Sequence, residues 1–234
     1  MIVVLTSRRP QGKNAYVGET LRQIDESASK ERRVLLSDGP LDDDFKVPVG
    51  WEVVFKQRPV IPPQNKWVAW TAFEMAAEAN EDLVFFEDDL EFCKNAPGYI
   101  AKFKVPDDLN FIVFYTPWLT HEQPIGLWRI HAGSYVMAQA MKFPVRTCKE
   151  LAATRNSELW TQGVMLGGLD EILRHIATEK RWRYGIFNPG IVQHIGENSV
   201  VGNGPLRGMR SAKNYAGKDL DPHDLMQASL GYFE

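Results

Sequence analysis

The sequence has few cysteines and no dominant sign of charge. Its 234 residues include only Cys93 and Cys148, and no CxxC spacing is present. A disulfide framework and a zinc ribbon are therefore excluded, and we expect two reduced, partly buried thiols. The 27 Lys and Arg residues face 30 Asp and Glu, for a net charge of −3. This balance argues against a uniformly basic nucleic-acid-binding protein.

Long apolar runs are missing as well. The longest, residues 111–119, contains Pro117 and is far shorter than the roughly 20 residues that cross a bilayer. Residues 2–5 are too short for an export signal and do not follow a basic region. We therefore expect a cytoplasmic protein, in the host cytoplasm if the gene is viral. With 44% hydrophobic and 24% charged residues, the composition excludes disorder, collagen and coiled coil.

Apolar strand patterns alternate with helical ones along the chain. Continuous β-branched and aromatic runs predict buried strands, and spacings of three and four predict helices. The expected strands are residues 2–6, 33–36, 51–55, 83–86, 111–115 and 128–137, and a short strand that ends at His194. The expected helices are residues 16–29, 68–79 and one that starts at Leu169 and stops near Gly185. The alternation predicts an α/β fold with a mainly parallel sheet flanked by helices, in which ligands bind beyond the carboxyl ends of the strands.

An acidic cluster follows one of these strands directly. Glu87, Asp88 and Asp89 come immediately after the apolar run 83–86. Three adjacent carboxylates repel one another unless a cation compensates them. Hard divalent cations prefer carboxylate oxygen and often share their shell with substrate phosphates. The position after a buried strand favours a metal site over a solvated turn.

Three segments resemble glycosyltransferases of the GT-A (Rossmann-like) fold. The run LVFFEDDLEF (83–92) resembles their DxD-type motif, often written EDD. The segment YGIFNPGIVQHIGENSVVG (184–202) resembles the QHIG region of N-acetylglucosaminyltransferase IV-like and related bacterial and phage enzymes. Between them, LWRIHAGSYVMAQ (127–139) resembles the strand under the acceptor site. The eukaryotic members carry a membrane anchor, and we expect none in this protein.

The resemblance implies a ligand set and a division of the chain. Glu87, Asp89 and His194 would hold Mn²⁺ or Mg²⁺, and Asp88 would lie near the ribose of a nucleotide-sugar donor. A single GT-A domain would span residues 1–197. Residues 198–234 would form a flexible basic loop and tail that packs on the donor site.

The GT-A layout also nominates residues at the nucleotide end of the site. Thr6, Ser7 and Arg8 follow the first strand, and Asp38 follows the second. Lys66 begins the next helix. Ordinary turn and capping roles are the alternative for each of these residues.

A basic region begins within the last predicted helix and continues beyond it. Residues 174–218 contain eight Lys and Arg but only two Glu. Gly202, Gly204 and Gly208 space out Arg207 and Arg210, which are candidates to bind the diphosphate bidentately. A solvated tail is the alternative.

Inverting sugar transfer needs a carboxylate that takes the proton of the acceptor hydroxyl. Asp170 and Glu171 open the helix that follows Gly167-Gly168, where the family layout places this base. We favour Asp170 because its side chain is shorter and less mobile. A carboxylate pair that only complements the helix dipole is the alternative.

The sequence thus predicts a metal-dependent glycosyltransferase, with inversion, and leaves the acceptor open. A glycan and a hydroxymethylated base of phage DNA are both compatible, because a basic region with tryptophans also suits flipped bases. A metal-dependent phosphohydrolase is the second hypothesis, although a DxDxT motif is absent. A non-catalytic carbohydrate-binding module is the third.

Overall fold

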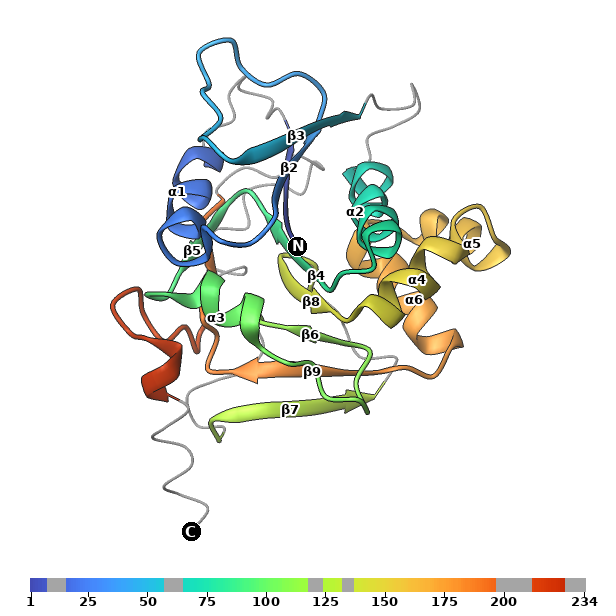
Figure 1. The fold of residues 1–234 in the computed structure, drawn as a ribbon. Helices are drawn as coiled ribbons and strands as arrows, with labels where there is room; N and C mark the ends of the chain where they lie inside the picture. The colour runs from blue at the N-terminus through green and yellow to red at the C-terminus, as the bar shows by residue number, and fades with distance from the viewer. Residues whose placement is uncertain (8–15, 57–64, 118–123, 132–136, 197–211, 226–234) are drawn as a thin grey trace.

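A large, mainly parallel sheet forms the centre of the molecule (Figure 1). The computed structural model describes residues 1–7, 16–56, 65–117, 124–131, 137–196 and 212–225. In spatial order the strands are β3 (Trp51–Lys56), β2 (Arg33–Asp38), β1 (Ile2–Ser7), β4 (Leu83–Glu87), β8 (Ala140–Phe143), β6 (Phe111–Val113), β9 (Arg183–Asn188) and β7 (Gly126–His131). Strands β8 and β7 run antiparallel to their neighbours, and the other six are parallel to one another. The carboxyl ends of these six strands therefore lie at one edge of the sheet.

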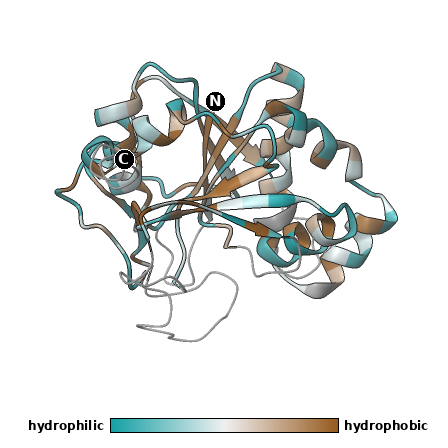
Figure 2. Ribbon diagram, turned by 90° about the horizontal axis from the view of Figure 1, so that it is seen from below, coloured by the Kyte–Doolittle hydropathy of each residue, from teal (hydrophilic) through white to brown (hydrophobic). Residues whose placement is uncertain are grey.

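Helices cover both faces of this sheet. On one face lie α2 (Asn65–Ala79), α4 (Val145–Thr154), α5 (Glu158–Leu166) and α6 (Leu169–Glu179). On the other lie α1 (Val17–Ala28), α3 (Ala96–Lys102) and a small antiparallel sheet of β5 (Leu90–Phe92) and β10 (Val192–His194). Figure 2 shows apolar strands between helices whose outer sides are hydrophilic. This arrangement confirms the α/β class, the mainly parallel sheet and the single domain.

The hydrophobic pattern explains both layers. In β1, Val3 and Leu5 join the core under α2, whereas Ile2 and Val4 join the core under α1. A strand buried on both faces needs apolar residues without alternation, as this run has. The stripe of α6 expected from the sequence is buried throughout, at Leu169, Ile172, Leu173, Ile176 and Ala177. Among the described residues, no helix has both the length and the apolar character needed to cross a membrane.

The end of α6 corrects the sequence prediction. The helix does not continue toward Gly185 but ends at Glu179. Lys180 caps it by donating to the carbonyl of Ile176, and Arg181 takes a left-handed φ of 54°. The N–H of Trp182 then donates to the carbonyl of Ala177, so the chain turns and enters β9 at Arg183.

Two strand predictions were too long. The strand that begins at Phe111 ends at Val113, and Phe114 and Tyr115 continue as buried coil. The strand predicted to reach Met137 ends at His131, and residues 132–136 lie outside the described chain. Six further elements had no sequence prediction: β5, β8, α3, α4, α5 and β9.

The described segment 212–225 packs against the small sheet. Ala212 donates its N–H to Oε1 of Gln193 at 2.8 Å, and Ala216 donates to the carbonyl of Gly190 at 2.9 Å. Lys94 donates its N–H to the carbonyl of Lys218 at 2.9 Å. These hydrogen bonds hold the segment on the same side of the molecule as β5 and β10.

Candidate metal and donor site

Three side chains expected to bind metal come together in space. One ligand atom each from Glu87, Asp89 and His194 lies within 4.8 Å of the other two. Nε2 of His194 is 3.1 Å from Oδ2 of Asp89. Asp89 and His194 are buried, and Glu87 is partly exposed. Within the described chain, this is the one group of three or more such residues that could hold a metal ion.

The fold brings these residues together through two strands. Glu87 is the last residue of β4, so its carboxylate lies at the carboxyl edge of the parallel strands. The chain turns through Asp88 and Asp89 into β5, which pairs antiparallel with β10. His194 ends β10 opposite Leu90, and the N–H of Ile195 donates to the carbonyl of Asp89 at 2.9 Å. The pairing of β5 with β10 therefore places His194 next to Asp89.

The donor set and its surroundings fit a divalent cation. Two carboxylates and an imidazole suit Mn²⁺, and the carboxylates alone suit Mg²⁺. Gly196 lies directly against Asp89, because a Cβ atom at residue 196 would collide with Oδ2 of that carboxylate. This space explains the glycine of the QHIG segment.

Asp88 points toward β1 and has a different partner from Asp89. Oγ1 of Thr6 donates to Oδ2 of Asp88 at 2.5 Å, and both residues are buried. Oγ of Ser7, the last residue of β1, lies 3.5 Å from Oδ2 of Asp38, the last residue of β2. The structure thus collects Thr6, Ser7, Asp38 and Asp88 at the carboxyl ends of three adjacent strands.

The two candidate bases lie in the first turn of α6. A connection of three residues, 180–182, leads from α6 into β9. Glu171 forms an ion pair with Arg174 at 2.8 Å, which holds it along its own helix. Asp170 turns back toward the helix start, where a Cβ atom at Gly168 would lie 2.7 Å from its Oδ1.

The side chains of four predicted donor-site residues lie outside the description. Arg8, Arg207 and Arg210 lie outside the described residues. Lys66 falls in the first turn of α2, as expected, but its side chain is outside the description.

The structure adds three residues that the sequence analysis did not single out. Thr20 of α1 bonds to the turn that contains Asp89. The ring of Tyr115, which follows β6, has its centroid 6.2 Å from that of His194. Gly196 is the third. A signal existed for Thr20, since it is a polar residue within the buried stripe Val17, Leu21, Ile24 and Ala28.

Comparisons with known proteins show the fold. No family model and no curated protein matches the chain. Among solved structures, the galactosyltransferase LgtC, in complex with donor and acceptor sugar analogs, aligns with a TM-score of 0.50 and 9% identity. This alignment covers 75% of this chain and 70% of that one. A glycosyltransferase involved in glycosylation of the major capsid of PBCV-1 aligns over 78% of this chain and 92% of that one, at 12% identity. Its TM-score of 0.35 is too low to establish a shared fold.

The likeness to LgtC agrees with the sheet order and the helix layers described above. The chain therefore has the GT-A, Rossmann-like fold of glycosyltransferases.

Proposed function

We propose that this chain is a metal-dependent glycosyltransferase that moves a sugar from a nucleotide-sugar donor to an acceptor hydroxyl. The observation that carries the proposal is the group formed by Glu87, Asp89 and His194. It lies at the carboxyl edge of a GT-A sheet, where open α/β sheets bind their ligands. The sequence resemblance to N-acetylglucosaminyltransferase IV-like enzymes supports the same residues.

The metal-binding role falls to the three clustered side chains. Glu87, Asp89 and His194 would hold Mn²⁺ or Mg²⁺. When bound, such a cation neutralises negative charge on a diphosphate leaving group. The pairing of β5 with β10 keeps Asp89 and His194 together before the cation arrives, which lowers the cost of assembling the site.

The nucleoside end of the donor would lie along β1 and β2. Ser7 and Asp38 are buried side chains that end these strands, and Thr6 holds Asp88 toward the same region. A buried carboxylate next to hydroxyl groups is a suitable acceptor for ribose hydroxyls. Arg8, Lys66, Arg207 and Arg210 remain candidates for the diphosphate on the strength of the sequence alone.

Asp170 is the proposed general base. Its carboxylate would take the proton of the acceptor hydroxyl while that oxygen forms a bond to the sugar C1. The bond between C1 and the diphosphate oxygen breaks on the opposite face, so the configuration at C1 is inverted. Glu171, which forms an ion pair with Arg174, is the second candidate.

We propose a glycan as acceptor, and the acceptor sugar analog bound to LgtC supports this choice. A hydroxymethylated DNA base is the other acceptor consistent with the sequence. A panel of both acceptors, with Mn²⁺ and a donor, distinguishes them by the labelled product.

The first experiment is a thermal-shift screen of nucleotide sugars with Mn²⁺. A donor that binds the native state raises the melting temperature. At 100 times its Kd, it raises the free energy of unfolding by about 2.7 kcal/mol. Release of nucleoside diphosphate should then require Mn²⁺ and disappear in Asp89→Asn. Release of inorganic phosphate without sugar transfer would instead indicate a phosphohydrolase. Binding of a sugar without any turnover would indicate a carbohydrate-binding module.

A further inference from the structure

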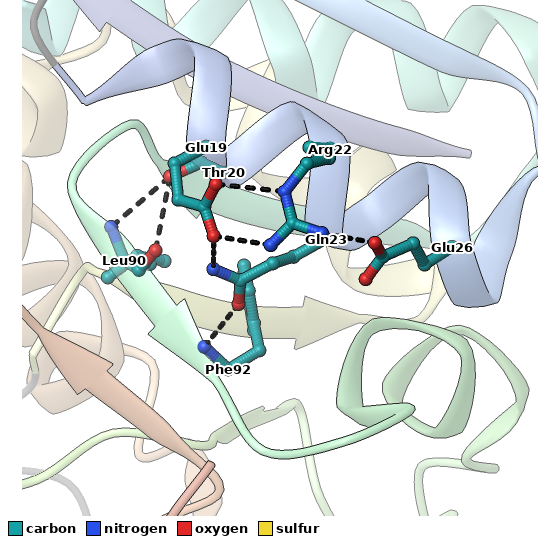
Figure 3. Close-up of polar contacts among 7 residues, drawn as sticks. All are labelled: Glu19, Thr20, Arg22, Gln23, Glu26, Leu90 and Phe92. Carbon is teal, nitrogen blue, oxygen red and sulfur yellow. Dashed lines mark hydrogen bonds and ion pairs between the residues drawn. The ribbon is translucent and has the colours of Figure 1, made fainter. Parts of the chain in front are cut away.

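The hydroxyl of Thr20 lies inside the protein at the start of α1. Thr20 is fully buried, and its neighbours on the same helix face are Val17, Leu21 and Ile24. The opposite side of α1 is an exposed ion-pair ladder in which Arg22 contacts Glu19 and Glu26 (Figure 3). A buried hydroxyl among apolar residues costs stability unless it is hydrogen-bonded.

The partners of Thr20 are the backbone groups on both sides of Asp89. Oγ1 of Thr20 donates to the carbonyl of Asp88 at 2.7 Å, and the carbonyl of Leu90 lies 3.2 Å away. The N–H of Leu90 donates to Oγ1 of Thr20 at 3.4 Å. One side chain thus fixes the peptide groups that precede and follow a proposed metal ligand.

The turn is held from its other side by β10. The N–H of Ile195 donates to the carbonyl of Asp89, and Leu90 pairs with His194. Asp89 therefore lies between a tether to α1 and a tether to β10. The hydrogen bonds to β10 are made by backbone groups, whereas those to α1 all involve Oγ1 of Thr20. A single substitution at Thr20 therefore removes the connection to α1.

A second side chain of α1 offers a matched control. Oε1 of Gln23 accepts from the N–H of Phe92 at 2.9 Å, at the far end of β5 (Figure 3). Thr20 and Gln23 both join α1 to this strand, but Gln23 acts three residues beyond Asp89.

We infer that Thr20 is a positioning residue for the metal site: it sets the orientation of Asp89 through the flanking peptide groups. This inference rests on the proposed function. Supporting groups around metal ligands typically contribute about 10–100-fold to metal affinity. A tether that only stabilised the fold would lower the melting temperature without changing that affinity in the folded protein.

The experiment is titration of the folded protein with Mn²⁺ alone, followed by calorimetry, together with thermal unfolding. Thr20→Val keeps the shape and removes the hydroxyl, and the Kd for Mn²⁺ should rise about 10-fold or more. Thr20→Ser keeps the hydroxyl and should restore a Kd close to that of the wild type. Gln23→Met should lower the melting temperature but leave the Kd unchanged. If Thr20→Val does not fold, Thr20→Ala replaces it and is judged by the same criteria.

Each outcome decides a different point. An unchanged Kd in Thr20→Val overturns the positioning role while leaving the metal site intact. An equal rise in Kd for Gln23→Met shows a general effect of α1 on stability and also overturns it. If the wild-type protein does not bind Mn²⁺, the proposed metal site itself fails, and the role of Thr20 fails with it.

Discussion

Nε2 of His194, at the end of β10, lies 3.1 Å from Oδ2 of Asp89, which belongs to the distant turn between β4 and β5. Both side chains are nearly buried, at 5% and 8% exposure. An exposed pair of this kind would contribute little, whereas a buried one restricts both groups to a single geometry. Such fixed geometry is what a preorganised metal site requires.

Asp89→Asn keeps the shape of the side chain and removes its charge. We expect Mn²⁺ affinity to fall by more than the roughly 100-fold that loss of a supporting group costs, because a direct ligand is lost. Isothermal titration measures this change, and Glu91→Gln removes an equal charge from β5 as a control. Equal losses in both variants would indicate that local charge attracts the cation without coordination.

His194→Ala should have a smaller effect. Glu87 and Asp89 still offer two carboxylates, so Mn²⁺ affinity is expected to fall about 10–100-fold. The circular dichroism spectrum should be unchanged, since β10 is held by its backbone pairing with β5. Wild-type affinity in this variant would leave His194 a purely structural residue.

Gly196→Ala tests the space beside Asp89. A Cβ atom here would collide with Oδ2 of Asp89 and lie 2.8 Å from its Cγ, so the carboxylate must turn away. We expect Mn²⁺ affinity to fall at least about 10-fold, as for other changes around a ligand. Gly18→Ala is the matched control, because its Cβ would meet only the ring of Phe45, at 3.7 Å. If both alanines bind Mn²⁺ like the wild type, Asp89 does not need its present orientation.

The acidic turn was predictable because it follows an apolar strand directly, and His194 because its segment resembles the QHIG region. The sequence was not sufficient for β8, which is inserted antiparallel between β4 and β6. The run Ala140–Phe143 contains Lys142, and its strand character comes from two neighbours that are distant in sequence. The side chain of Lys142 is buried, and its Nζ donates to the carbonyl of Ala101 at 2.6 Å, near the end of α3. This hydrogen bond offsets part of the cost of burying the ammonium group. Burial lowers the pKa of this ammonium, and only the folded structure shows that environment.

The role of Thr20 was equally beyond the sequence. Its place on the helix was predictable from the spacing of Val17 and Leu21, but its partners belong to a turn on another element. Contacts of this kind depend on how α1 packs against β5, and local patterns do not encode that packing.

The buried thiol of Cys148 predicts a loss of stability at alkaline pH. Burial raises the pKa of Cys148 from 9.0 to about 12. The unfolded chain therefore releases this proton first, so the stabilising contribution is complete below pH 9 and is lost as the pH rises toward 12. By pH 10, wild type should lose about 1.4 kcal/mol more than Cys148→Ala, relative to pH 8. Urea unfolding at both pH values measures this difference, and parallel curves for the two proteins would contradict the assignment.

The last prediction concerns the choice between Asp170 and Glu171. Successive helix residues point about 100° apart, so the two carboxylates of this first turn face different directions. Glu171 forms an ion pair with Arg174, and a Cβ atom at Gly167 would lie 3.2 Å from its Cγ. Asp170 instead approaches the N-terminal end of α6 at Gly168. We favour Asp170 as the base because its side chain is the shorter and less mobile of the two.

Asp170→Asn should lower kcat by roughly 10²–10⁴, the usual contribution of a general base, with donor affinity unchanged. The asparagine retains the size of the side chain, so the fold and Mn²⁺ binding should be preserved. Glu171→Gln is the matched control and should alter kcat much less, because it loses only the ion pair with Arg174 and the helix-dipole interaction. Initial rates at saturating donor measure both effects, and the anomeric configuration of the product by NMR reports inversion. If Glu171→Gln is the inactive variant, the roles are exchanged. If both variants transfer sugar at the wild-type rate, neither carboxylate is the base, and a product with retained configuration would show that the reaction needs none.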